Sequence, residues 1–310
     1  MPTRSYNETV EDLALELVWS LWAELGVSGW NRRHEGVAID LEPLIIATSH
    51  LGSRNDRLLR ESLDWCVMNA RFVSAVRLRN LLPSFSDAAQ KGFGKFAATV
   101  RKHKPVSWPS QTGASALKWA PTGRSVVPEL DRPALVQLKL RALFGVSARA
   151  EILLRMLPEP TRPFGISELS MYTAFGKDNL SDALDLLVLA GAVVRNLMTT
   201  AGNVQVFRLA AEEGLRSLLV DVPSPNGFPF WIARFRLLTH LIDFAASAPT
   251  DRTARAATIE RLLSNLQMDL RWVASNPRLY RGVDEVNEGF DDWSVAMLTR
   301  WASTNGNTSA

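Results

Sequence analysis

Residues 166–209 carry the pattern that constrains the fold most, because helical and strand periodicities follow one another there at short spacing. Apolar or small residues in steps of three and four predict two helices joined by a tight turn: Ile166, Leu169, Thr173, Leu180, Ala183, Leu184 and Leu187. Ser170 supplies the small side chain needed where the helices meet, and Gly176 permits the turn. The segments AGAVVRN and VQVFRL, separated by TTAGN, then predict a β-hairpin.

The preceding residues extend this pattern into a complete module. RPALVQLKLRALFGVSARAEILLRML has helical spacing, and Gly145 divides it into two predicted helices. Helix, helix, turn, helix and hairpin is the order of a winged helix. Over residues 140–210 the chain resembles the winged-helix transcriptional regulators of the MarR/ArsR type, on LFGVSARAEILLRML, GISELSMYTAFGKDNLSDALDLLVLAGAVVRN and VQVFRL.

The resemblance implies double-stranded DNA as the partner, with the second helix of the pair in the major groove. Carried onto this chain, the reading positions are Lys177, Asp178, Asn179, Ser181, Asp182 and Asp185, and those on or beside the wing are Arg195, Thr199, Thr200 and Asn203. Asparagine can pair with adenine and aspartate can accept from the amino group of cytosine, so part of this set suits base reading. The implied function is transcriptional regulation by DNA binding.

The aspartates of the same helix support a second interpretation. Asp178, Asp182 and Asp185 project from one side, where each carboxylate would lie close to phosphate. Leu186, Val188 and Leu189 lie outside the usual core positions and indicate that the helix also docks against something else. The alternative function is therefore a protein-interaction or antitoxin-like module that binds a partner protein.

Basic residues are concentrated before the module. Residues 54–146 contain sixteen Lys and Arg against six Asp and Glu, a net charge of +10. This block predicts contacts with phosphate, above all from Arg101, Lys102 and Lys104, and its other candidates are Arg54, Arg57, Arg77, Arg79, Lys91 and Lys95. The alternative is a set of solvated helix faces.

The remainder of the chain predicts a mainly α fold. We expect a helical N-terminal domain at 1–104, a Pro-rich linker or surface arm at 105–132, the winged helix at 133–210 and a helical region at 211–310. Trp108 and Trp119 indicate that the Pro-rich segment packs on something, since such side chains usually find a surface.

Winged-helix regulators commonly pair on two half-sites, so the resemblance also implies a homodimer. The predicted seam is an apolar stripe formed by Ile259, Leu262, Leu266, Leu270 and Val273. The alternative is that this stripe packs on the 228–247 helix of the same chain.

Catalytic and metal-binding patterns are weak. The four histidines are far apart, Cys66 is the only cysteine and lies on an apolar helix face, and KGFGK lacks the setting of a phosphate-binding loop. We predict no enzymatic activity, no cofactor and no metal. A single cysteine, an acidic N-terminal segment and the lack of a long apolar run favour a cytoplasmic protein without a membrane segment.

Overall fold

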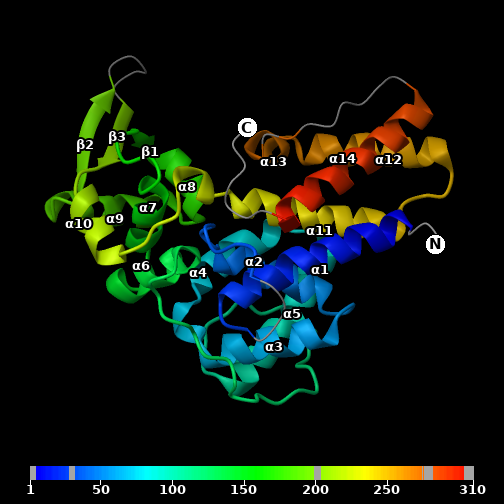
Figure 1. Cartoon of the computed structure of the whole chain (residues 1–310), viewed down its shortest axis with the longest axis horizontal. Coiled ribbons are helices and arrows are strands. Elements are labelled where there is room, and N and C mark those ends of the chain that lie inside the picture. Colours follow the sequence, from blue (N-terminus) through cyan, green and yellow to red (C-terminus); the bar gives the residue numbers. More distant parts are fainter. Residues whose placement is uncertain (1–4, 28–31, 199–203, 274, 276–281, 304–310) are drawn as a thin grey trace.

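The computed structural model describes residues 5–27, 32–198, 204–273, 275 and 282–303. The chain is mainly helical with one small antiparallel sheet, as predicted (Figure 1). It consists of a helical body, built from both ends of the sequence, and a central domain at residues 133–220.

In its described residues, the first half of the helical body contains five α-helices: α1 (Tyr6–Glu24), α2 (Leu41–Leu51), α3 (Asp56–Met68), α4 (Ala75–Leu81) and α5 (Asp87–His103). Ser5 and Glu8 form the capping box predicted for α1. The glycines of KGFGK lie inside α5, where a Cβ on Gly92 would come within 2.6 Å of the Ser49 carbonyl oxygen. Gly92 therefore allows α5 to approach α2 closely, which gives these glycines a packing role.

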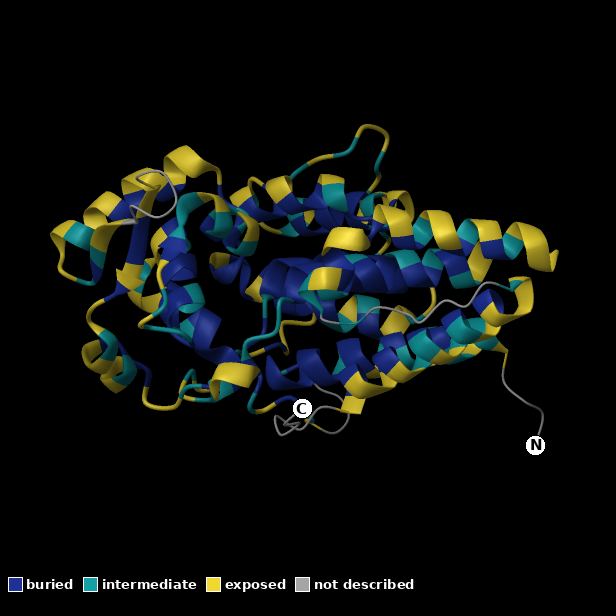
Figure 2. Cartoon of the chain, turned by 90° about the horizontal axis from the view of Figure 1, so that it is seen from above, coloured by how far each residue is buried: buried dark blue, intermediate teal, exposed yellow. Residues whose placement is uncertain are grey.

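The second half of the body follows the central domain: α11 (Trp231–Ser247), α12 (Arg252–Asn265), α13 (Gln267–Trp272) and α14 (Val283–Ser303). α14 packs along α1, and α11 packs on α1 and α2. The sequence divides these two regions, but their buried side chains form one continuous core. Figure 2 shows the buried residues on the facing sides of these helices and the exposed residues on their outer sides.

The predicted dimer seam is wrong. Ile259, Leu266 and Leu270 are at most 4% exposed, and they belong to the core of their own chain. Leu262 and Val273 pack against the same core. The stripe packs within its own chain. Its α13 part lies on α11, which is the alternative that the sequence left open, whereas its α12 part packs mainly on α14.

The Pro-rich segment is an arm laid over the body, as expected. Trp108 is buried and stacks on Phe93 and Phe96 of α5, with ring centroids 6.2 and 6.4 Å away. Further along, the Asp64 carboxylate accepts four backbone N–H groups of the arm, at 2.5–3.1 Å, from Thr122, Gly123, Arg124 and Ser125. These two contacts hold the arm in place, although residues 105–132 form no helix or strand.

The central domain consists of α6 (Val136–Phe144), α7 (Ala148–Met156), β1 (Phe164–Gly165), α8 (Ile166–Thr173), α9 (Lys177–Leu189), β2 (Val193–Met198) and β3 (Val204–Leu209). The four helices and the hairpin follow the predicted order, and β1 is a strand that the sequence did not predict. Gly145, with φ 76°, ends α6 as expected. The sheet order is β1-β3-β2, with Val193 opposite Leu209 and Arg195 opposite Phe207. α10 (Glu212–Leu219) completes this domain, because Leu215 and Leu219 lie in its core.

The turn between α8 and α9 differs from its prediction in one respect. The left-handed residue is Ala174, with φ 56°, whereas Gly176 has φ −64° and begins α9 as its N-cap. A left-handed alanine is unfavourable, and neighbouring contacts compensate for it. The Ala174 N–H bonds to the Ser170 carbonyl, and the Ala174 carbonyl accepts from Asn80 of α4 at 2.9 Å.

Candidate functional site

The exposed face of α9 is the candidate site, because the fold leaves it open as the resemblance implies. Leu180, Ala183, Leu184 and Leu187 are buried in the central domain. The opposite face is exposed, including all six predicted reading residues: Lys177, Asp178, Asn179, Ser181, Asp182 and Asp185. The 3.6-residue period produces this division, with the core positions on one side of the helix and the polar positions on the other.

A ridge runs along the centre of this exposed face. With 100° between successive residues, Asp178, Asp182, Asp185 and Leu189 lie directly opposite the buried side. Leu189 is 84% exposed, and Leu186, beside the ridge, is 52% exposed. The ridge is therefore acidic along most of its length and apolar at its C-terminal end.

β2 continues this surface from the hairpin. Arg195 forms an ion pair with Asp185, and its guanidinium lies 5.5 Å from the centre of the Phe207 ring. Leu197 is two residues further along β2, so it shares a strand face with Arg195, and it is 65% exposed. Of the other predicted wing contacts, Thr199, Thr200 and Asn203 lie outside the described residues. The guanidinium that the wing was expected to offer to DNA is thus occupied by a carboxylate of α9.

Much of the basic block is neutralised within the chain. Arg54 and Arg57 pair with Glu11 and Glu61. Arg101 donates to the carbonyl oxygens of Trp108 and Pro109, at 3.1 and 2.7 Å, so it holds the arm. Arg101 therefore has a structural role, and its contact with phosphate remains a prediction. Lys102 and Lys104, the other two predicted phosphate contacts, are exposed.

Three exposed lysines of the basic block form a row on α5. Lys91, Lys95 and Lys102 recur at helical spacing on α5 and are all exposed. They belong to the helical body, whereas the α9 ridge belongs to the central domain. The cations and the predicted reading helix therefore lie on different units of the molecule.

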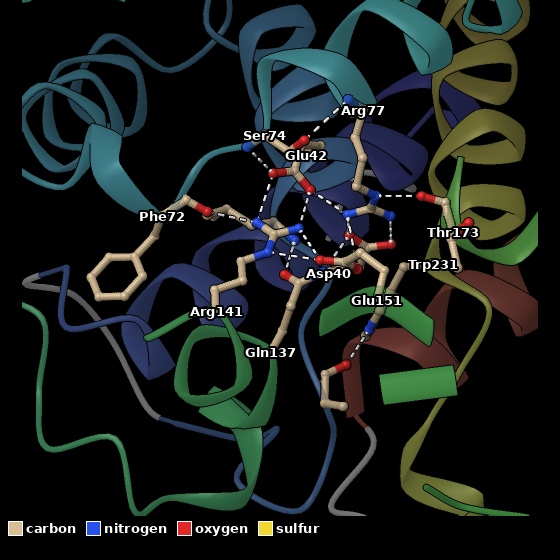
Figure 3. Close-up of polar contacts among 12 residues, drawn as sticks. Asp40, Glu42, Phe72, Ser74, Arg77, Gln137, Arg141, Glu151, Thr173 and Trp231 are labelled. Carbon is tan, nitrogen blue, oxygen red and sulfur yellow. Dashed lines mark hydrogen bonds and ion pairs between the residues drawn. The ribbon is translucent and has the colours of Figure 1, made fainter. Parts of the chain in front are cut away.

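A buried ionic cluster joins these two units, and Figure 3 shows Glu42 between two guanidinium groups. Arg141 of α6 donates to both Glu42 oxygens at 2.7 and 2.8 Å, and to the Glu151 carboxylate at 2.8 Å. Arg77 of α4 also contacts Glu42, and it binds both oxygens of Asp40 at 2.6 and 2.7 Å. Glu42 and Arg141 have no exposed surface at their side chains.

The charges of this cluster are mutually stabilised. Burial alone would raise the pKa of Glu42, but the charges of Arg141 and Arg77 hold that pKa below its ordinary value. The Glu42 carboxylate also accepts the Ser74 N–H at 2.7 Å. Removal of one member would leave an opposite charge buried without its partner.

The cluster reaches the α8–α9 turn. Arg77 Nε donates to the Thr173 carbonyl at 2.8 Å, next to the Ala174 carbonyl that Asn80 holds. Both donors come from α4 of the helical body. The orientation of α9 is thus fixed by the body, which distinguishes this domain from one attached through a linker.

Sequence reasoning missed the cluster. The signal was present as single charged residues in apolar helices: Glu42 in LEPLIIATSHL and Arg141 in VQLKLRALF. Charged residues at core positions usually have a buried partner, but one sequence does not show which. Arg77, counted in the basic block, is 1% exposed at its side chain, so it has no surface to offer phosphate.

One close contact between a histidine and a carboxylate lies in the helical body. His50 Nε2 of α2 lies 2.8 Å from the Asp243 carboxylate of α11. Within the described ranges, no three His, Cys, Asp or Glu side chains gather as a metal site would require. Cys66 is fully buried, as its apolar helix face predicts.

Comparisons with family models, with curated proteins and with solved structures found no match to this chain. None of the helices in the described part combines the length and the apolar character that crossing a bilayer requires.

Proposed function

We propose that the central domain binds a partner protein through the α9–wing surface, defined as Asp178, Asp182, Asp185, Leu186, Leu189 and Leu197. The observation that carries this proposal is the composition of the ridge, with three carboxylates followed by a leucine that is 84% exposed. Large apolar side chains grouped at the surface mark interaction sites more often than isolated ones do.

The charge of the surface defines the partner. Asp178 and Asp182 are exposed and form no ion pair among the described residues, whereas Asp185 binds Arg195. A complementary partner would offer lysines or arginines beside an apolar groove that accepts Leu186 and Leu189. Such electrostatic complementarity gives specificity and a fast association rate, while burial of the leucines supplies affinity.

DNA binding by the same helix is the second candidate. Lys177, Asn179 and Ser181 are exposed in the first turns of α9, where a recognition helix contacts bases, and Lys91, Lys95 and Lys102 offer a basic stripe. Three further proposals belong to the DNA-binding candidate: membership in the MarR/ArsR-type regulators, a regulatory role and a cytoplasmic location. The acidic ridge opposes this candidate, because each unpaired aspartate near phosphate costs Coulomb energy.

Affinity capture from a cytoplasmic extract, with quantification of each bound protein, tests the first proposal. Leu189→Asp should lower the captured amount of a saturably binding partner at least about tenfold, because it places a charge in the proposed apolar contact. The matched control is Leu218→Asp, which changes a leucine of 53% exposure on α10. Equal capture by both variants would contradict the proposed surface.

Titration with random duplex DNA at two salt concentrations tests the second candidate. Paired Asp178→Asn and Asp182→Asn substitutions should raise affinity for DNA at low salt if α9 enters a groove, because repulsion is removed. If α9 binds a protein, the same substitutions should leave DNA binding unchanged and weaken the partner complex. A clear gain in DNA affinity without any effect on the partner would favour the DNA candidate.

A further inference from the structure

A pocket of about 330 Å³ lies between the central domain and the helical body. Its walls come from both units: Arg155 of α7 and Tyr172 of α8 on one side, and Phe230, Arg234 and Trp272 on the other. Pockets of this size, formed at a junction between units and lined with aromatic side chains, are common sites for small organic ligands. This pocket lies apart from the α9–wing surface and plays no part in the proposed function.

Three aromatic rings form a wall of the pocket. Tyr172 lies 4.8 Å from Phe230 and 5.1 Å from Trp272, and Phe230 lies 5.4 Å from Trp272, between ring centroids. The rings meet edge-on or tilted, so they do not cover one another's faces. Such a wall favours a planar apolar group that can stack or pack against an aromatic edge.

Arg234 supplies a positive charge that no carboxylate among the described residues neutralises. Its guanidinium lies 5.2 Å from the Trp231 ring and 5.3 Å from the Trp301 ring, and among the described residues no carboxylate lies within ion-pair distance. Burial and the nearby Arg300 charge lower the pKa of Arg234 to about 10, so it is still charged at neutral pH.

The acidic groups of the pocket are already paired. Asp40 is bound by Arg77 at 2.6 and 2.7 Å, Glu151 by Arg141 at 2.8 Å, and Glu159 by Arg155 at 2.9 Å. Their carboxylates still lie beside the pocket and would repel a second negative charge on a ligand. Among the described residues of the lining, no second cation is free to offset that repulsion. One unneutralised guanidinium and an aromatic wall therefore favour a ligand with one negative charge and a flat ring.

We infer that this pocket binds a planar aromatic monocarboxylate, with the carboxylate on Arg234 and the ring against Tyr172, Phe230 and Trp272. A carboxylate matches the two-pronged geometry of the guanidinium. Because the walls belong to both units, a bound ligand stabilises their junction, in addition to the ionic cluster. The ligand therefore raises the thermal stability of the whole chain by mass action.

Calorimetric titration of the full chain tests this inference, with benzoate, 2-naphthoate and indole-3-acetate as probes. At least one carboxylate should bind saturably, with a dissociation constant below about 1 mM. The uncharged 2-naphthamide should bind at least about tenfold more weakly than 2-naphthoate, because it lacks the charge that pairs with Arg234. 2-Naphthyl phosphate, as a dianion, should also bind more weakly than the carboxylate.

Arg234→Gln should weaken carboxylate binding at least about tenfold and leave the amide unaffected. The matched control is Arg261→Gln, which changes an exposed arginine outside the pocket and should leave both affinities unchanged. Absence of saturable binding of all three carboxylates up to about 5 mM would overturn the inference. Equal affinities for naphthoate and naphthamide would overturn it as well, and that comparison uses the unaltered chain, so it holds even if Arg234→Gln fails to fold.

Discussion

His34 Nε2 lies 2.9 Å from the Trp301 carbonyl oxygen, 267 positions later in the chain. On the other side of the ring, Nδ1 lies 2.7 Å from the Ser20 hydroxyl. A carbonyl can only accept, so Nε2 carries the proton of the neutral ring. The single proton of the Ser20 hydroxyl lies between Nδ1 and the Leu17 carbonyl, which the same hydroxyl approaches to 2.8 Å. This neutral imidazole connects α1 to the end of α14, and it is one reason why the two terminal regions share a core.

The first prediction concerns pH. Burial, together with the charges of Arg234 and Arg33, lowers the pKa of His34 from 6.5 to about 4. The unfolded chain therefore binds more protons between these values, so this stability is fully present above about pH 6.5 and is lost as the pH falls toward about 4. Over that interval His34 should contribute a decrease of about 3 kcal/mol in the free energy of unfolding.

Urea denaturation of the wild type and of His34→Gln at pH 7.5 and pH 4.5 checks this. The loss of stability on acidification should be smaller in the variant by about 2–3 kcal/mol. His103→Gln serves as the control, because it removes a half-buried imidazole outside this contact. If the wild type and His34→Gln lose equal stability on acidification, His34 does not couple folding to pH.

The second prediction concerns the ionic cluster. Arg141→Met should destabilise the chain by about 3–5 kcal/mol at pH 8, because Glu42 and Glu151 would remain buried without their main cation. Arg216→Met, which breaks an exposed pair with Glu212 on α10, should cost less than about 1 kcal/mol.

Acidification distinguishes buried charge from lost packing in this experiment. Without Arg141, the buried Glu42 carboxylate can become neutral by protonation, so the penalty of Arg141→Met should be smaller at pH 5 than at pH 8. The measurement is the difference in unfolding free energy between wild type and variant at the two pH values. A penalty that does not change with pH would assign the effect to packing of the arginine side chain.

The third prediction concerns the arm. In Asp64→Asn, one carboxylate oxygen that accepts backbone N–H groups of residues 122–125 is replaced by an amide that donates. The arm should detach locally, so trypsin should cleave after Lys118 and Arg124 much faster than in the wild type. Asp56→Asn, which changes an exposed aspartate paired with Arg60, provides the control.

The contact between the Asp64 carboxylate and the arm should also respond to acid. Backbone N–H groups from Gly123, Thr122 and Ser125 hold the pKa of Asp64 below its ordinary value, although burial opposes them. Its contribution is therefore present above the ordinary pKa of about 3.9 and is lost as the pH falls below it. An acid-stable protease should cleave the wild-type arm faster as the pH falls through this range, and an unchanged cleavage rate would contradict the role of Asp64.

The sequence predicted the elements whose pattern is local. The buried face of α9, the hairpin, the break at Gly145 and the capping box of Ser5 and Glu8 all depend on residues within a few positions of one another. The exposure of the candidate site followed from the same periodicity. These parts could be predicted because helical and strand periods determine which side chains share a face.

The sequence could not show which apolar faces meet. The stripe at Ile259, Leu266 and Leu270 has the same composition whether a second copy or the chain's own core covers it. The basic block was misleading for a related reason, because charge counts do not show that Arg77 and Arg141 are buried beside Glu42. Ala174 could not be found either, since its left-handed turn depends on contacts from α4.

The last prediction tests the corrected role of the apolar stripe. Leu266 is 3% exposed in the core of its own chain, so Leu266→Asp would bury an unpaired charge there. We expect this variant to lose at least about 3 kcal/mol of stability, or to fail to fold. The matched control is Met268→Asp on α13, because Met268 is 53% exposed and should tolerate the same charge. Denaturation and light scattering together separate the two roles, since a seam between copies would yield a folded Leu266→Asp chain of half the wild-type mass.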